Sequence, residues 1–334
     1  MSKLPLAVLS LLGATSLLAY GCASSESDLG ASTAAASSAD SSTSATTGAG
    51  GAGGAGGATT TATTTAATTS GTGGAGQGGS TGQGGGPEGE HLVISELAAA
   101  PGPAEFIEIW NPTDADVDLT DYYLSDNGTY YSIAAGDLWN PITDNPGTDF
   151  LARFPAGLVL PKDGVFVIAT DPGFETTFSK CPDLILAAQD LACASGGVAK
   201  AMLKPVGGDL GSAPGAMVSN AREMMVLFTW DGNTANPLKD VDYLTWGDVW
   251  EAGSRADKTG IAGYQADTNP DNQKGATVPS TGASIARCSG GVEIDEKIAG
   301  GNGLTGHDET SEDLYWSYSL QVAPTPGAKN PCLP

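Results

Sequence analysis

Two carboxylates, Glu105 and Glu108, are the first residues in the chain whose type and spacing could do chemistry. Two carboxyl groups that face one substrate could act as general acid and base. Here they lie in a segment where apolar and polar residues alternate, with Phe106, Ile107 and Ile109 interleaved, which is typical of a half-buried β-strand. Side chains three positions apart on a strand point to opposite faces. The two glutamates therefore cannot share a substrate, and we expect them to be polar, solvent-exposed positions of a structural strand and not a catalytic pair.

His91 and His307 are the only imidazoles in the chain. A nucleophilic mechanism needs a nucleophile, a base and an orienting group within hydrogen-bond reach. Outside the low-complexity segment 22–90, the sequence has no Gly-x-Ser-x-Gly elbow, and no cysteine motif goes with either histidine. We expect His307, in a polar loop, to lie on the surface. The cysteine spacings fit no zinc motif, so we predict no structural zinc site.

A calcium loop is suggested by the Asp-x-Asn-x-Asp pattern of Asp267, Asn269 and Asp271. A complete loop has Gly at its sixth position and a bidentate Glu at its twelfth, where this chain has Asn272 and Val278. These residues are therefore weak calcium candidates, and a solvated turn is the default. The sequence indicates no other cofactor or metal.

Four cysteines remain when Cys22, near the N-terminus, is set aside. An even number in an exported domain predicts two disulfides, with free thiols as the alternative in a reducing environment. Three pairings are possible. We favour the pair that brackets one long loop and the pair that would attach the C-terminal tail: Cys181–Cys193 and Cys288–Cys332.

Aromatic residues and a sequon give two further candidates for carbohydrate chemistry. Asn127-Gly128-Thr129 matches a glycosylation sequon, but Asn-Gly is first a hairpin-turn signal, with Tyr130 to Ile133 as the returning strand. Four tryptophans could line a sugar-binding face: Trp110, Trp230, Trp246 and Trp316. The alternative is a structural role, in which they pack in the core or at a sheet edge.

The elements that position these residues are short strands separated by Gly, Pro, Asn and Asp turns, a pattern that indicates an all-β sandwich. Helical periodicity is not sustained, and Leu184 to Ala194 is the best helix candidate. The expected strands cover residues 91–98, the strands of 105–126, 158–160, 165–169, 224–228, 242–246, 283–287 and 315–318.

The stretch Glu105–Asp126, preceded by Val93-Ile94-Ser95-Glu96, resembles the start of a lamin tail domain. Later features follow in the family's order, including Val241-Asp242-Tyr243 and Pro324-Thr325-Pro326-Gly327-Ala328, so that the resemblance covers most of 91–330. It implies an immunoglobulin-like β-sandwich with no catalytic residues of its own. In bacteria, such domains typically occur on exported or surface proteins.

The domain 91–334 is long for a single small sandwich, and two insertions near 171–217 and 247–281 account for the surplus. Long loops on a rigid scaffold commonly carry binding sites. If the protein recognises a ligand, we expect these insertions to take part.

The N-terminus predicts export. Residues 1–21 have the short positive region, the apolar stretch and the small-residue end of a signal peptide, and Cys22 directly after Ala19-Tyr20-Gly21 resembles the lipidated cysteine of a bacterial lipobox. An ordinary signal peptidase site is the alternative. Residues 22–90 are rich in Gly, Ser, Thr and Ala and cannot bury enough apolar surface to fold, so they are predicted to be a disordered linker.

The chain carries 38 acidic and 14 basic residues, a formal charge of −24, which repels phosphate backbones and argues against nucleic-acid binding. We therefore expect a non-catalytic, surface-displayed binding or structural module with a lipid anchor at Cys22, in the bacterial cell envelope as an outer-membrane or surface lipoprotein. Its partner would be the membrane and an envelope or extracellular protein or glycan. The alternatives are a secreted protein, a hydrolase with its site on the insertions, and a calcium-stabilised adhesin.

Overall fold

The structure is a computed structural model of the whole chain, and its described residues all belong to the unit 76–334. The predicted signal peptide, Cys22 and almost all of the predicted linker lie outside the described residues. The described residues are 90–136, 149–205, 218–247, 254–290, 292–321 and 323–332.

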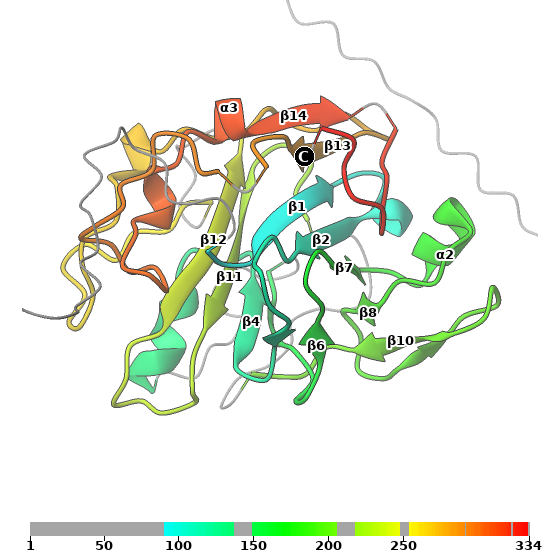
Figure 1. The fold of residues 1–334 in the computed structure, drawn as a ribbon, viewed down its shortest axis with the longest axis horizontal. Coiled ribbons are helices and arrows are strands. Elements are labelled where there is room, and N and C mark those ends of the chain that lie inside the picture. Colours follow the sequence, from blue (N-terminus) through cyan, green and yellow to red (C-terminus); the bar gives the residue numbers. More distant parts are fainter. Residues whose placement is uncertain are drawn as a thin grey trace, which may run out of the picture. The chain divides into compact units, whose positions relative to one another are not determined.

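The larger sheet has eight strands in the order β14-β13-β1-β2-β7-β8-β10-β9 (Figure 1). Its centre is antiparallel, whereas β8 runs parallel to both β7 and β10. The strands are β1 (Val93–Ala98), β2 (Phe106–Trp110), β7 (Val165–Ala169), β8 (Leu184–Ile185), β9 (Leu191–Ala192), β10 (Val198–Ala201), β13 (Ser284–Arg287) and β14 (Tyr318–Gln321).

A second, four-stranded antiparallel sheet has the order β12-β11-β4-β5, and β3 and β6 form a separate pair. The longest pairing of the fold is here, between β11 and β12. The strands are β3 (Val117–Asp118), β4 (Tyr122–Ser125), β5 (Leu151–Arg153), β6 (Val159–Leu160), β11 (Glu223–Thr229) and β12 (Lys239–Trp246).

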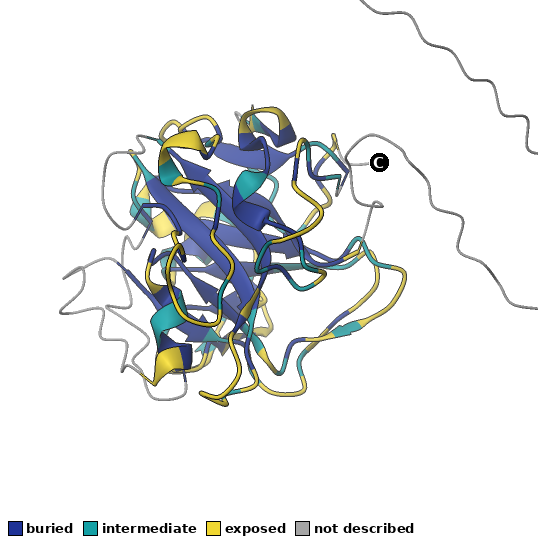
Figure 2. Cartoon of the chain, turned by 90° about the vertical axis from the view of Figure 1, so that its left-hand side faces the viewer, coloured by how far each residue is buried: buried dark blue, intermediate teal, exposed yellow. Residues whose placement is uncertain are grey.

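The hydrophobic core lies between the two sheets, because one buried cluster contains Ile94 and Ile107 of the first sheet together with Leu124 and Val226 of the second. Figure 2 shows the strands as mostly buried and the connecting loops as largely exposed. The predicted all-β sandwich is confirmed.

The strand β2 is buried on both faces, so the prediction of a half-buried strand with solvent-facing glutamates was wrong. Ile107 and Ile109 face the core. On the other face, Phe106 packs edge-on against Phe174 of the helix α2 (Gly173–Phe178), and the Glu108 carboxylate accepts a hydrogen bond of 2.6 Å from the Gly327 backbone N–H. The alternation predicted the two faces correctly but could not predict that α2 and the C-terminal segment cover the second one.

The expected hairpin at Asn127-Gly128 is also absent. The Asn127 side chain accepts hydrogen bonds from the backbone N–H and hydroxyl of Thr129, both at 2.7 Å, and the chain continues into a 3-10 helix, η2 (Tyr130–Ala135). The helix ends at Gly136, whose φ of 81° favours glycine. Local side-chain bonding to the backbone has replaced the tight turn.

The first insertion contains no helix between Leu184 and Ala194. Its described part consists of α2, followed by the strands β8, β9 and β10. The predicted disulfide Cys181–Cys193 is present in it. Short apolar runs do not distinguish strand from helix by periodicity alone, and here strand pairing prevails.

The second insertion and the C-terminal segment pack against each other beside β12. The Thr268 hydroxyl donates a hydrogen bond to Asp308, and the predicted disulfide Cys288–Cys332 joins the end of the chain to the residue after β13. The expected strand 315–318 is mostly helix, since α3 (Leu314–Ser317) comes just before β14. The remaining elements are the 3-10 helices η1 (Gly102–Ala104), η3 (Pro270–Asn272) and η4 (Glu309–Ser311). None of the helices in the described ranges has the length and apolar character needed to span a bilayer.

Candidate metal centre

The two histidines of the chain, far apart in the sequence, meet inside the domain. His91 comes two residues before β1, is 6% exposed, and donates from Nδ1 to the Leu92 carbonyl at 2.9 Å. Because Nδ1 carries this proton, Nε2 is the nitrogen directed at other groups, and it lies 3.3 Å from Oε2 of Glu293. A backbone carbonyl therefore fixes the ring orientation of His91.

His307 is 7% exposed, so the expectation of a surface histidine was wrong. Its Nδ1 lies 3.1 Å from Oε2 of Glu296, and its Nε2 lies 3.9 Å from Oε2 of Glu90. The loop around it is covered because the chain folds back onto β12, where Leu304 donates its backbone N–H to the Asp240 carbonyl. Close packing at Gly301, where a Cβ would come 1.9 Å from the His307 carbonyl oxygen, admits only glycine.

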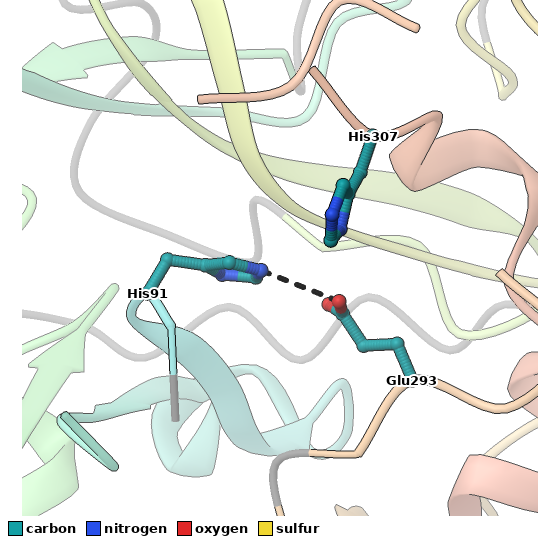
Figure 3. A group of neighbouring side chains, drawn as sticks. All are labelled: His91, Glu293 and His307. Atoms are coloured by element: carbon teal, nitrogen blue, oxygen red, sulfur yellow. Dashed lines mark hydrogen bonds and ion pairs between the residues drawn. The ribbon is translucent and has the colours of Figure 1, made fainter. Parts of the chain in front are cut away.

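Glu293 stands between the two imidazoles. One ligand atom from each of His91, Glu293 and His307 lies within 4.8 Å of the other two, and Figure 3 shows both rings directed toward the Glu293 carboxylate. Two imidazoles and one carboxylate form a ligand set that proteins use for zinc and related divalent metals.

The same glutamate belongs to a second group, with Asp242 of β12 and Glu309 of η4, whose carboxylate oxygens also lie within 4.8 Å of one another. Glu309 is 3% exposed, and both of its carboxylate oxygens are buried without a hydrogen-bond partner. Glu293 and Glu296 are also buried, and their two carboxyl groups are hydrogen-bonded to each other. Buried polar groups of this kind are ordinarily satisfied, so the cluster has unused ligand capacity.

The buried guanidinium of Arg287 pairs directly with acids of this region. Arg287 of β13 is fully buried and binds Asp242 at 2.9 Å and Glu312 at 2.7 Å. Burial raises the pKa of Asp242 to about 6 and that of Glu312 to about 7, although the Arg287 charge favours both carboxylates. One guanidinium cannot neutralise the charge of all the carboxylates around it, and the raised pKa values mean that these carboxyl groups bind protons more readily than usual.

Burial and mutual repulsion also set the protonation of the histidine–glutamate part of the cluster. Burial opposes the charge on His91, but the hydrogen bond and charge of Glu293 raise its pKa to about 9. Burial and the neighbouring Glu293 charge raise the pKa of Glu296 to about 10. Burial, then Glu293 and Glu296, raise the pKa of Glu309 well above its ordinary value. Without a bound cation the cluster must therefore hold protons at neutral pH.

The residues that suggested a calcium loop are not arranged as one. Asp267 is buried and engages Nζ of the fully buried Lys258 at 3.1 Å, while Asn302 donates to its other oxygen at 2.7 Å. The Asn269 side chain accepts from the Asp271 backbone N–H and caps η3. An ion pair has replaced the proposed calcium ligand.

The other sequence candidates are structural. Glu105 accepts from the Thr170 hydroxyl at 3.3 Å and Glu108 accepts from Ser95 at 2.7 Å, so both are buried and bonded to different partners. The tryptophans do not form one sugar-binding face, because Trp230 and Trp246 belong to the core, Trp110 packs under Lys329, and Trp316 is exposed.

Sequence reasoning missed Glu293, Glu296 and Glu309. They lie among 38 acidic residues, and nothing in a single sequence marks an acid as buried. The available signal was that the chain's only two histidines both lie in the folded domain.

The hydrolase alternative required both insertions to close over clustered acids and His307. The second insertion packs on that segment through Thr268 and Asp308, whereas the described part of the first insertion packs against the outer face of β2 through Phe174. Two shallow pockets of about 400 Å³ each open elsewhere on the described surface. One is lined by Pro237–Lys239, Gly263–Gln265 and Gly301–Gly306, and the other by Asp121, Thr229–Asp231, Asn236, Pro237 and Lys239.

Comparison with known protein families agrees with the β-sandwich fold. The family model of the lamin tail domain matches residues 87–247. None of the curated proteins matches the chain. Among solved structures, the chain is similar to a DUF4876 family protein from Bacteroides thetaiotaomicron, with 14% identity over 71% of this chain and 72% of that one and a TM-score of 0.37. Glu293 and His307 lie beyond the matched range. Residues 87–247, which contain β1 to β12, belong to the lamin tail domain family.

Proposed function

We propose that this protein is a non-catalytic binding or structural module that a lipid anchor at Cys22 displays on the bacterial cell surface. The observation that carries the proposal is the burial of the groups that could do chemistry. His91, His307 and Glu293 are each less than a tenth exposed, and neither shallow pocket is lined by any of them. Catalytic groups need a concave site that admits substrate, and these side chains are enclosed by the fold.

The two pockets support a recognition role for one end of the sandwich. They adjoin at Pro237 and Lys239, which line both, and Gly263–Gln265 of the second insertion line one of them. The aromatic rings of Tyr264 and Trp230 accompany polar backbone there, a combination that suits a glycan or a polar protein segment. Lys239 is exposed and offers a positive contact on a strongly acidic chain.

Membrane display is tested with the full-length chain expressed in a bacterial host. We expect the wild-type protein to fractionate with membranes and to incorporate a labelled fatty acid, and Cys22→Ser to be released without label. Ser24→Ala serves as the control and should behave as wild type. Unchanged fractionation of Cys22→Ser would refute the anchor.

Recognition is tested by applying the full-length Cys22→Ser protein to a glycan array and to purified envelope components. Reversal of charge in Lys239→Glu should reduce binding about tenfold or more, since a single well-placed charged contact contributes on the order of 1.4 kcal/mol. The matched control is Lys162→Glu, an exposed lysine in the turn before β7. Equal binding by both variants would place recognition elsewhere, and measurable turnover of a bound glycan would replace the binding module with an enzyme.

A further inference from the structure

We infer that His91, Glu293 and His307 bind one divalent transition-metal ion of the zinc class inside the domain, through both imidazole Nε2 atoms and a Glu293 carboxylate oxygen. This inference does not depend on membrane display or on ligand recognition. It rests on the geometry of three side chains, on the partners that orient them, and on the unpartnered acid beside them.

The spacing of the donor atoms is close to that of a tetrahedral zinc site. In a tetrahedral zinc site with bonds near 2.0–2.1 Å, neighbouring ligand atoms are roughly 3.3 Å apart. His91 Nε2 and Glu293 Oε2 are 3.3 Å apart, and the three donors lie within 4.8 Å of one another. Small side-chain rotations would therefore bring all three to bonding distance.

The second argument is the orientation of the two rings. A histidine that binds metal usually donates its other ring N–H to a carbonyl or carboxylate, which fixes the tautomer. The Nδ1 of His91 donates to the Leu92 carbonyl, and the Nδ1 of His307 lies within hydrogen-bond distance of Glu296. Both rings thus leave Nε2 for the metal, and both point toward Glu293 (Figure 3).

The third argument is the charge around Glu293. Glu309 is 3% exposed and both of its carboxylate oxygens are without a hydrogen-bond partner. One of these oxygens lies within 4.8 Å of carboxylate oxygens of Asp242 and Glu293. A plain ion pair between His91 and Glu293 would account for those two residues but would leave Glu309 unexplained. A divalent cation would offset the surplus of buried carboxylates, which is costly to maintain without a partner.

The ion would crosslink segments of the domain that are far apart in the sequence. His91 stands just before β1, Glu293 follows β13, and His307 precedes η4. These segments are more than 200 residues apart at the extremes, so one ion would join the start of the folded domain to its C-terminal part. Glu90, whose Oε2 lies 3.9 Å from His307 Nε2, or a water molecule could complete four-coordination.

The test uses the full-length Cys22→Ser protein, stripped with a chelator and titrated with Zn²⁺ by calorimetry. We expect one ion per chain, a melting temperature that rises on metal addition, and intense visible absorption when Co²⁺ replaces Zn²⁺. Glu293→Gln and His307→Gln should each weaken binding by about 100-fold or more, and Glu296→Gln by roughly 10- to 100-fold, because it orients His307.

Asp295→Asn is the matched control, since it removes an exposed acid from the same segment and asparagine tolerates the positive φ of 61° at that position. It should bind Zn²⁺ as wild type does. Absence of Zn²⁺ binding by the unsubstituted chain, equal affinity in all variants, or binding of Ca²⁺ alone would each overturn the inference. If the variants do not fold, X-ray absorption on the unsubstituted protein decides: two nitrogen neighbours at about 2.0 Å are expected, and sulfur neighbours would contradict the site.

Discussion

Glu108 provides a sharp test of the electrostatics of this fold, because it is a fully buried carboxylate that is not one of the proposed metal ligands. It lies on the covered face of β2, where it accepts hydrogen bonds from the Ser95 hydroxyl at 2.7 Å and the Gly327 N–H at 2.6 Å. Burial raises the pKa of Glu108 to about 7 in spite of these two hydrogen bonds, which favour the charged form, and the nearby Glu96 charge adds to the rise.

The sign of the effect on stability follows from proton binding. Between pH 4.5, the ordinary pKa of a glutamate, and about 7, the folded state holds a proton that the unfolded state has released, so stability falls as pH rises through this window. At 1.36 kcal/mol per pH unit, the loss contributed by Glu108 is about 3 kcal/mol above pH 7. Glu108→Gln removes the ionisation and keeps the bonds, since the amide oxygen accepts from Gly327 and the amide nitrogen donates to Ser95.

The assay is equilibrium unfolding in urea of the full-length Cys22→Ser protein, with and without Glu108→Gln, at pH 4 and pH 8. The two proteins should be equally stable at pH 4, and the glutamine variant should be more stable at pH 8 by up to about 3 kcal/mol. Asp114→Asn, at an exposed turn, is the control and should show no such difference. A glutamine variant that is less stable at pH 8 would show that the charged carboxylate stabilises this site and would refute the argument.

Three further substitutions probe the buried ion pairs and the C-terminal attachment, each measured by chemical unfolding. Arg287→Met leaves two buried carboxylates without their cation and should destabilise by roughly 3–5 kcal/mol; a neutral result would mean that both acids are protonated in the folded protein. Lys258→Met removes the ammonium that two buried aspartates share and should cost a similar amount, with a smaller loss at acid pH. Cys332→Ser opens the disulfide to Cys288, 44 residues away, and should lower the free energy of unfolding by about 4 kcal/mol. As a check, reducing agent should destabilise the unsubstituted protein by at least as much.

The strands that run through the middle of the sandwich could be predicted from the sequence because apolar side chains dominate them. The runs at 165–169 and 224–228 correspond to β7 and β11. The alternation of Phe106 to Trp110 predicted two distinct faces, and both exist. What alternation cannot convey is which later segment covers an outer face, and for this reason Glu108 was wrongly expected in solvent.

Local signals failed where a side chain competed for the backbone. Asn127-Gly128 matches a hairpin turn, yet the Asn127 carboxamide bonds to Thr129 and a 3-10 helix follows. The relevant competition is between two arrangements of nearly equal local energy, and tertiary packing of the buried Tyr130 decides it.

The candidate metal centre lay beyond prediction for a different reason. His91, Glu293 and His307 approach one another only because β13 pairs beside β1 and the following chain folds back onto β12. No spacing in the sequence encodes that meeting, and acids destined for burial look the same as the many that are not. The disulfides were more predictable, because four cysteines allow only three pairings.

The most direct test of zinc binding by His91, Glu293 and His307 is a crystal structure of the zinc-loaded protein, with data collected on both sides of the zinc absorption edge. We expect one anomalous peak, between the Nε2 atoms of His91 and His307 and the carboxylate of Glu293, with ligand distances of about 2.0–2.2 Å. A map with no peak there, in which His91 and Glu293 form only an ion pair, would contradict zinc binding at this site.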